Sequence, residues 1–560
     1  MTVINDLENI VGNRYVITSK EKSLQYREGY RSGRGDALAV VRPGSLLELW
    51  KILQVVQKND LIVIMQAANT GLTEGSVPTD GGYDRDVLVI NVMRIKGMQL
   101  IDDNKQVIAF PGTTLHELET NLDKVHRDPH SVIGSSNIGA TVIGGINNNS
   151  GGALIQRGPA YTELALYAQI TADGQLKLVN HLGIELGSTP EEILTNLENH
   201  NYSAKDVQYD PNRVGHNRNY EERVRNVTSD QPTRYNADPQ ELYEVSGSAG
   251  KLVAFAVRLD TYPKPKETKV FYIGTNNPDV LEKLRRHILT KFKHLPISGE
   301  YMHKDAYDLA KKYGKDSLMV IEYLGTNPLP FLFSFRAATE RKLRHIPTFK
   351  PDFIDRTLQK SSVLFPNQLP KRMEEFRNKY DHYLQLKVAD DGIAETKQYL
   401  DEFFKDNEGG YFECTPHEAN VAAIHRYVAA SVPIRYQETH QKQGNQILPL
   451  DVALPRNEEK WFETLPKEID DQIQYKMYYG HFLDHVMHQD YILKPGVDAH
   501  ELKKEMLKLF DARGAIYPAE HNVGHLYHAP EALVHHYREN DPTNTFNPGI
   551  GLTSKKKNWQ

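Results

Sequence analysis

The chain has 560 residues, a formal net charge of −6 and a pI near 6.5. Hydrophobic residues account for 39% and charged residues for 25%, which excludes wholesale disorder and leaves room for more than one core. An acidic chain of this kind is not a general nucleic-acid binder, so no nucleic-acid partner is expected. The single cysteine, Cys414, excludes an intramolecular disulfide and any multi-cysteine metal site, and it favours a protein that faces the cytosol.

No apolar run approaches the roughly 18 residues that a membrane-spanning helix requires. The first residues also lack the basic and apolar regions of a secretory signal. A spanning helix is therefore not expected, whereas attachment to a membrane surface stays open.

The first 265 residues show strands, glycine loops and crossover helices. Apolar side chains recur at helical spacing over 46–56, and the run 61–65 is typical of a strand buried on both faces. Further elements are predicted as strands at 87–92 and 99–112, a helix at 114–124, a hairpin at 164–180 around Asp173-Gly174, and a strand at 252–262. This order predicts an α+β domain of a nucleotide-binding type.

The composition changes after Pro263-Lys264-Pro265. Residues 270–292 are predicted as strand, turn and helix, residues 330–380 are basic and aromatic, and strand and helix patterns alternate again over 381–510. Glycine motifs return in the tail, over 515–560. We expect a second α+β domain that is interrupted by a basic insert.

Three glycine-rich loops lie in the first domain, at 66–76, 129–152 and 247–252. Glycines and short hydroxyl side chains let backbone amides approach a pyrophosphate closely. The first loop alone is equally typical of an ordinary turn, because it is neither a Walker loop nor a Rossmann GxGxxG motif. Together the loops favour a long ligand that is held at several places.

The three loops and the closing segment DPTNTFNPGIG (541–551) resemble the flavin domain of the vanillyl-alcohol-oxidase type. With YRSGRGDALAVV (30–41) and AEHNVGHLY (519–527), nearly the whole chain resembles the bacterial quinone-dependent D-lactate dehydrogenases. The resemblance implies an α+β fold with a PCMH-type FAD-binding domain, an α+β cap (substrate) domain and a basic membrane-attachment insert. It also implies oxidation of D-lactate to pyruvate, with hydride passing to flavin N5 and electrons passing to a membrane quinone of the respiratory chain.

The same resemblance divides the chain into five parts. The FAD-binding domain is expected over 1–265, completed by 511–560. The cap is expected over 266–329 and 388–510, on either side of the membrane-attachment segment 330–387.

The resemblance also implies which residues hold FAD. The expected set is Ala67, Ala68, Asn69, Thr70, Gly71, Gly75 and Ser76 around the diphosphate, Gly134, Thr141 and Gly151 along the isoalloxazine and ribityl path, and Ala254 at the adenine end. Residues 66–76 contain no histidine or cysteine. We therefore expect non-covalent FAD.

Histidines and a glutamate cluster in two segments of the second half, GHFLDHVMHQD (480–490) and AEHNVGH (519–525). His481 and His488 are seven residues apart, which fits two helical turns or a bulged strand, and with Glu520 they can share a divalent metal. The alternative is that they are ordinary solvated or core histidines. Related D-2-hydroxyacid dehydrogenases place two histidines and a glutamate on a metal, but this chain departs from their GHxGDGNxHxN and EHG motifs, so the metal is left open.

Oxidation of a 2-hydroxyacid requires a base for the hydroxyl proton and a cation for the carboxylate. The resemblance implies His521 as the base, and histidine titrates in the required range. Arginine binds carboxylates with a fork of donors. Arg426 is the first candidate and Arg435 the second, with a surface arginine as the alternative reading.

The segment 336–379 contains eleven Lys/Arg and five Asp/Glu, a net of +6, so the other residues sum to −12. Phenylalanines accompany the charge, and such a mixture suits anionic lipid headgroups. The alternative is a solvated basic face. In the resembling enzymes this region attaches to the membrane, which predicts a peripheral protein on the cytoplasmic face of the bacterial inner membrane.

Two other functions stay open at this point. One is an FAD dehydrogenase of another D-2-hydroxyacid, such as 2-hydroxyglutarate. The other is a non-catalytic membrane-bound scaffold with the same fold.

Overall fold

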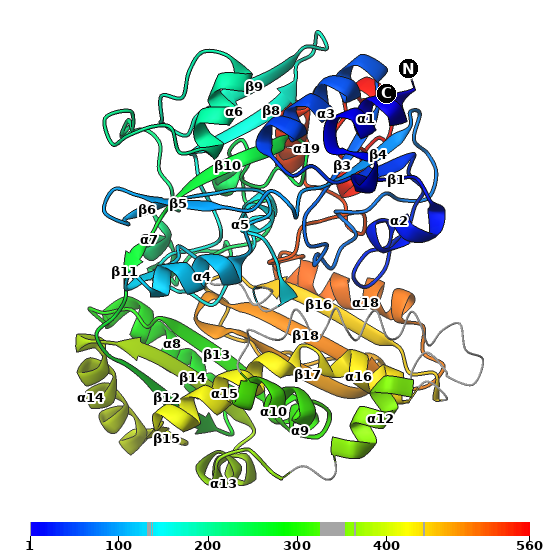
Figure 1. Cartoon of the computed structure of the whole chain (residues 1–560). Helices are drawn as coiled ribbons and strands as arrows, with labels where there is room; N and C mark the ends of the chain where they lie inside the picture. Colours follow the sequence, from blue (N-terminus) through cyan, green and yellow to red (C-terminus); the bar gives the residue numbers. More distant parts are fainter. Residues whose placement is uncertain (1, 132–135, 137, 325–352, 363–365, 441–442) are drawn as a thin grey trace.

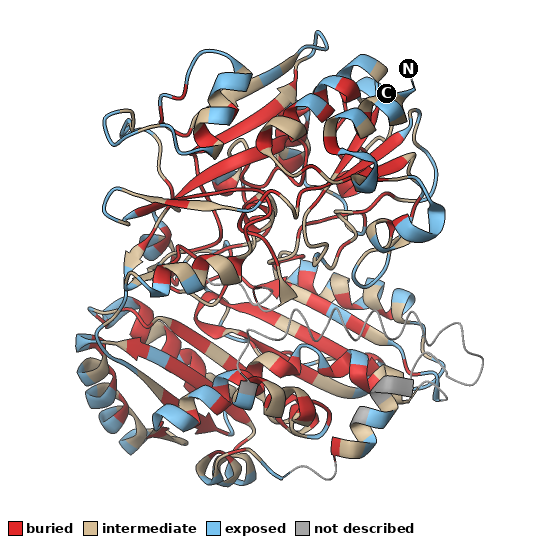
Figure 2. Ribbon diagram, in the orientation of Figure 1, coloured by how far each residue is buried: buried red, intermediate tan, exposed pale blue. Residues whose placement is uncertain are grey.

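The computed structural model describes the chain except for residues 1, 132–135, 137, 325–352, 363–365 and 441–442. The elements form two lobes, and both chain termini lie in the same lobe (Figure 1). Buried residues are concentrated within the sheets and on the helix faces that cover them (Figure 2).

A mainly parallel sheet begins the first lobe. Its strand order is β1-β2-β4-β3, and β4 pairs in parallel with both β2 and β3. The strands are β1 (Val16–Ile17), β2 (Ala39–Val41), β3 (Ile62–Gln66) and β4 (Val87–Asn91). The helix expected over 46–56 is α3 (Leu46–Asn59), which begins where the Ser45 hydroxyl accepts from the Glu48 amide and ends at Asp60 in the left-handed conformation. Its apolar stripe packs on this sheet together with α1 (Val3–Val11).

An antiparallel sheet completes the first lobe, in the order β5-β6-β10-β8-β9. Its strands are β5 (Met98–Ile101), β6 (Gln106–Ala109), β8 (Ala165–Ile170), β9 (Leu176–Asn180) and β10 (Val253–Asp260). The hairpin expected around Asp173-Gly174 is confirmed as β8 and β9. Helices α4 (Leu115–Asp123) and α5 (Val142–Asn147) share a core with one face of this sheet.

The second lobe is built on a seven-stranded antiparallel sheet, in the order β15-β12-β14-β13-β17-β18-β16. Its strands are β12 (Thr268–Thr275), β13 (Ser298–His303), β14 (His382–Ala389), β15 (Gly410–Glu413), β16 (Ile447–Ala453), β17 (Ile473–His481) and β18 (Val486–Leu493). Among the described residues, no strand from the first 265 joins this sheet.

Helices cover both faces of the large sheet. One core includes α8 (Pro278–Lys291), α14 (Asp391–Asp406) and α18 (Ala499–Ala512). The core on the opposite face includes α9 (Lys304–Tyr313), α10 (Lys315–Leu324), α13 (Lys371–Lys379), α15 (Pro416–Ala429) and α16 (Val432–Thr439). The sheet therefore serves as the rigid layer from which β13, β16, β17 and β18 present side chains.

The last residues of the chain return to the first lobe after α19 (Glu531–Asn540). The Val63 amide donates to the Thr545 carbonyl at 3.0 Å, and the Asn547 amide donates to the Val63 carbonyl at 2.8 Å. The Asn547 side chain also donates to the Gly75 carbonyl at 2.9 Å. The C-terminal segment thus pairs with β3 and holds the glycine loop that follows it.

Residues 336–352 and 363–365 of the basic segment 336–379 lie outside the described residues. Its described parts are α12 (Phe353–Ser361) and α13. In the part of the chain that the structure describes, no helix combines the length and the apolar character that crossing a membrane demands.

Candidate active site

The first glycine loop, 66–76, follows β3, and hydrogen bonds link its two ends. The Gln66 side chain donates to the carbonyls of Ser76 at 2.9 Å and Tyr26 at 2.8 Å, and the Ser76 hydroxyl donates to the Asn69 side chain at 2.7 Å. A Cβ atom added at Gly71 would meet nothing within 4 Å. Hydrogen bonds therefore hold the two ends of the loop, while there is free space beside Gly71 in its middle. This arrangement fits a bound diphosphate.

The other residues expected around the flavin lie on several elements. Thr141 begins α5 and accepts from the Gly144 amide at 3.2 Å. Ala254 lies in β10 opposite Tyr167, and the ladder shifts register between residues 254 and 256, which leaves backbone groups outside the regular pairing. A Cβ atom at Gly151 would stand 2.1 Å from Glu520 Oε1, so this glycine allows the flavin-side loop to touch the histidine cluster. Gly134 lies outside the described residues.

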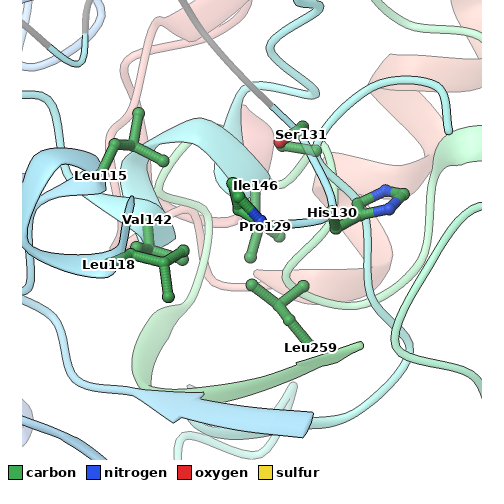
Figure 3. A pocket seen from close by; sticks show the side chains of 9 residues that line it. Leu115, Leu118, Pro129, His130, Ser131, Val142, Ile146 and Leu259 are labelled. Atoms are coloured by element: carbon green, nitrogen blue, oxygen red, sulfur yellow. The ribbon is translucent and has the colours of Figure 1, made fainter. Parts of the chain in front are cut away.

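A small apolar cavity lies beside this region, between α4, α5 and the end of β10 (Figure 3). Leu115, Val142 and Leu259 contribute to its wall, with His130 at one side. Its volume of about 10 Å³ holds at most one water molecule, so it is too small for a flavin ring. Burial lowers the pKa of His130 to about 4, which keeps this imidazole neutral at pH 7.

His481, His488 and Glu520 converge at the junction of the two lobes. His481 ends β17 and His488 lies in the neighbouring strand β18. The helical reading of their spacing is wrong, because a short turn at 482–485 folds the segment into a hairpin. Glu520 Oε2 lies 3.4 Å from His481 Nε2 and 3.7 Å from His488 Nε2. One ligand atom from each residue lies within 4.8 Å of the others, so the donors fit a single divalent cation.

The Glu520 carboxylate is surrounded by positive charge. Arg234 donates to its Oε1 at 2.7 Å and also lies 3.1 Å from Asp484. Burial alone would raise the pKa of Glu520, but the charges of His481 and Arg234 outweigh burial and hold this pKa far below its usual range. The carboxylate therefore stays ionised, as a metal ligand must.

Behind His481 lies a second carboxylate, Glu300 on β13. His481 Nδ1 lies 2.6 Å from Glu300 Oε1, and Arg426 Nη2 lies 3.0 Å from Glu300 Oε2. Burial opposes the charge on His481, but Glu300 and Glu520 outweigh it and raise its pKa to about 10. Arg426 on α15 also lies over the Tyr479 ring, 4.6 Å from its centroid, and its Nε is buried without a hydrogen-bond partner. Arg435 is instead paired with Asp316 at 3.0 Å.

His521 is fixed by Asp451 at the end of β16. His521 Nδ1 lies 2.7 Å from Asp451 Oδ2, and the same oxygen accepts from the backbone amide of Glu520 at 2.8 Å. Asp451 Oδ1 lies 3.2 Å from His488 Nδ1. Burial lowers and the Asp451 charge raises the pKa of His521, with a net rise. The His521 side chain is 35% exposed, and its Nε2 makes no hydrogen bond to the described residues.

Sequence reasoning missed Glu300, Asp451 and Arg234. Each lies far along the chain from the side chain that it holds, and none belongs to a motif. Asp451 alone had a local signal, since it interrupts the apolar strand ILPLDVAL (447–454).

Two family models match this chain. Residues 37–179 match the model of an FAD binding domain, and residues 270–559 match the model described as D-lactate dehydrogenase, membrane binding. The solved structure of p-cresol methylhydroxylase with substrate bound covers 98% of this chain and 96% of its own, with a TM-score of 0.56 at 10% identity. That likeness confirms the α+β fold of PCMH type that the sequence predicts.

Two curated proteins align along the full chain. The quinone-dependent D-lactate dehydrogenase of Escherichia coli (strain K12) is 56% identical over 557 residues, which is 100% of this chain and 97% of the relative. That of Haemophilus influenzae is 56% identical over 558 residues, which is 100% of this chain and 99% of the relative. This chain, with its FAD-binding and membrane-binding parts and its histidine–carboxylate site between two lobes, belongs to the quinone-dependent D-lactate dehydrogenases.

Proposed function

We propose that the chain oxidises D-lactate to pyruvate and passes the electrons to a membrane quinone. The observation that supports this most directly is His521, which Asp451 holds by Nδ1 while Nε2 has no hydrogen bond to the described residues. Bound FAD supplies the acceptor for the hydride that leaves the substrate α-carbon. The base and the cation for the carboxylate are side chains of this chain.

His521 acts as the base in this proposal. Its Nε2 takes the proton of the substrate hydroxyl, and Asp451 stabilises the imidazolium that forms. The same carboxylate orients His488, so base and neighbouring ligand are fixed by one side chain. Because the Asp451 side chain is only 11% exposed and the neighbouring histidines hold its pKa well below the usual range, it keeps its charge, and the orientation of His521 is set before substrate binds.

We propose His481, His488 and Glu520 as the ligands of a divalent metal, which would displace the proton that Glu300 and Glu520 hold on His481 and would polarise the substrate hydroxyl oxygen. Chelation should then lower the rate of flavin reduction by D-lactate, and an added divalent ion should restore it. If elemental analysis of active enzyme finds no stoichiometric metal, the two histidines act instead as hydrogen-bond donors to the substrate.

Arg426 stays our candidate for a cation near the substrate carboxylate. Its guanidinium is shared with Glu300, and its free Nε is the part that a substrate oxygen could use. Arg426→Lys should raise the substrate concentration required, because a point charge replaces a planar fork.

For the flavin we propose the loop 66–76 at the diphosphate, Thr141 and Gly151 along the ring and ribityl path, and Ala254 near adenine. Attachment is proposed as non-covalent, since the loop has no histidine or cysteine. Acid denaturation should release free FAD, and flavin that stays with the precipitated chain would contradict this. The domain division at 265/266 and 510/511 is part of the same proposal.

The decisive experiment is an absorption spectrum before and after anaerobic D-lactate. Rapid bleaching of the flavin band supports the function, and faster bleaching by D-2-hydroxyglutarate would indicate the other substrate. A colourless protein would favour a non-catalytic scaffold.

We further propose that the basic segment attaches the enzyme to anionic lipid on the cytoplasmic face of the membrane. Among its described residues, Arg372 is hydrogen-bonded to Glu418 and Arg377 to Asp308. These two ion pairs hold α13 to the rest of the lobe. Lys371 is 91% exposed and stays a candidate for lipid contact.

A vesicle assay tests attachment. Replacing Arg341, Lys342 and Arg344 with glutamine should reduce binding to anionic vesicles while reduction by D-lactate with a soluble dye continues. Binding of the native protein should weaken with salt, because the Debye length falls from about 10 Å at 0.1 M to about 3 Å at 1 M. A variant that binds as tightly as the native protein would contradict the proposal.

A further inference from the structure

Arg31 is a cation of the first lobe that the proposed chemistry has not used. It lies in the loop 29–35, it is exposed, and its guanidinium has no hydrogen-bond or ion-pair partner among the described residues. An arginine without a partner among the described residues is available to an anion that comes from outside.

The loop that bears Arg31 is fixed onto the flavin loop. The Gly29 amide donates to the Gly33 carbonyl at 2.9 Å, and the Ser32 hydroxyl donates to Glu74 Oε1 at 2.6 Å. Gly33 lies so close to Glu74 that a Cβ atom there would stand 2.6 Å from its side chain. The position of Arg31 is therefore set by the same loop, 66–76, that we assign to the diphosphate.

The segment that bears His521 contacts the same place. The His525 amide donates to the Thr73 carbonyl at 2.9 Å, and Gly524 packs against Thr73. Arg31 and His521 thus extend from two segments that rest on adjacent residues of one loop. The two side chains come close enough for the positive charge of Arg31 to act on His521.

The charge of Arg31 also reaches groups of the second lobe across the junction. Its charge acts on Tyr479 in β17, on Asp490 in β18, and on Tyr527. Asp490 does not form an ion pair with Arg31. The Asp490 carboxyl is buried and accepts a hydrogen bond from the Tyr479 hydroxyl. Burial raises the pKa of Asp490, and the Arg31 charge opposes this rise. The loop that bears Arg31 thus lies next to the segment of the base, and the Arg31 charge reaches β17 and β18.

We propose that Arg31 binds the carboxylate of the 2-hydroxyacid substrate from the flavin side of the site. This inference rests on the proposed function, in which His521 takes the hydroxyl proton. A 2-hydroxyacid bears its carboxylate on the carbon next to the hydroxyl, so the two groups need a cation and a base that are neighbours. Arg426, by contrast, lies behind His481, and its guanidinium already forms an ion pair with Glu300.

The test compares Arg31→Gln and Arg31→Lys with the control Arg34→Gln. Arg34 lies in the same loop, is also exposed, and pairs with Glu28 at 3.6 Å. We expect Arg31→Gln to keep its FAD and to raise the D-lactate concentration for half-maximal flavin reduction by about 10- to 100-fold, the loss of a charged hydrogen bond. The limiting rate should change less, Arg31→Lys should lie between, and Arg34→Gln should match the native protein.

Two further probes distinguish a loss of carboxylate binding from a general loss of activity. Oxalate, a dicarboxylate that cannot be oxidised by hydride loss, should perturb the flavin spectrum at lower concentration in the native protein than in Arg31→Gln. The preference for D-lactate over D-lactamide, whose amide is neutral, should shrink in Arg31→Gln and not in Arg34→Gln. Unchanged D-lactate and oxalate dependence in Arg31→Gln, or equal losses in both variants, would overturn the role of Arg31 alone. A native flavin that D-lactate does not reduce would overturn the proposed function and this inference with it.

Discussion

Arginine–carboxylate pairs occur in two very different settings in this molecule. At the junction of the lobes, Arg234 is 1% exposed and lies between Asp484 and Glu520. At α13, the Arg377 side chain is 31% exposed and pairs with Asp308, itself 39% exposed. The chemistry of the two pairs is the same, but only the first pair has been removed from water.

Burial changes what such a pair does. In water-exposed pairs the charges are screened and their net effect on stability is about 0–1 kcal/mol. In a buried group the loss of one partner leaves an uncompensated charge, so the remaining side chains depend on one another. At the junction, burial and neighbouring charges therefore shift the pKa values of the side chains and fix their positions, which suits catalysis. At α13 the pairs hold one helix in place.

The largest effect is expected at His521. His521→Ala should keep the flavin but slow its reduction by D-lactate by about 10²- to 10⁴-fold, the usual contribution of a positioned base. His417→Ala is the matched control, because His417 lies 3.7 Å from Glu322 with a side chain that is 64% exposed. Stopped-flow absorbance of both variants measures the difference, and rapid reduction in His521→Ala would remove this residue from the role of base.

Arg234→Met should destabilise the folded protein by about 3–5 kcal/mol, since Asp484 and Glu520 would both lose their buried partner. Urea unfolding followed by circular dichroism and by flavin fluorescence measures this loss. Both signals should shift to lower urea, because Arg234 links Glu520 to the Gly152 carbonyl on the flavin side. A native-like midpoint would show that the buried charges find other partners.

The same substitution at α13 should do far less. Arg377→Met is expected to change stability by about 0–1 kcal/mol, as for other exposed pairs. The urea experiment used for Arg234→Met serves here as well. Equal destabilisation by the two substitutions would mean that burial is not what separates the two settings.

The smallest expected effect concerns acid and α13. The Arg372 hydrogen bond lowers the pKa of Glu418 from its ordinary 4.5 to about 2. A lowered pKa means that this pair stabilises the fold above pH 4.5 and loses its contribution as the pH falls through 2. The difference in urea midpoint between native protein and Arg372→Gln should therefore shrink as the pH is lowered from 4.5. A difference that stays constant would rule out Glu418 as its source.

The fold was predictable wherever the signal was local. The spacing of apolar residues over 46–56 and the Asp173-Gly174 turn identified α3 and the β8–β9 hairpin, because a helix period and a tight turn are written in neighbouring residues. The interval between His481 and His488 was not decisive, since His485 in the left-handed conformation ends a turn that the spacing does not reveal.

The sequence predicted some residues of the site but not the residues that hold them in place. Family motifs pointed to His521 and Glu520, which the structure brings together with His481 and His488. The residues that hold them were not predictable, because Glu300 is 181 residues from His481 and Arg234 is 286 from Glu520. Such pairs exist only after the lobes have formed, and a single sequence contains no local trace of them.

The bonds between Val63 and the segment 545–547 bear on how the chain is made. While a ribosome is still adding the last residues, β3 has no neighbour on that side, and Asn547 cannot yet hold Gly75. An unpaired strand edge of this kind invites wrong pairing during synthesis. The loop 66–76 therefore reaches its final form only after residues 545–547 have been made and have paired with β3.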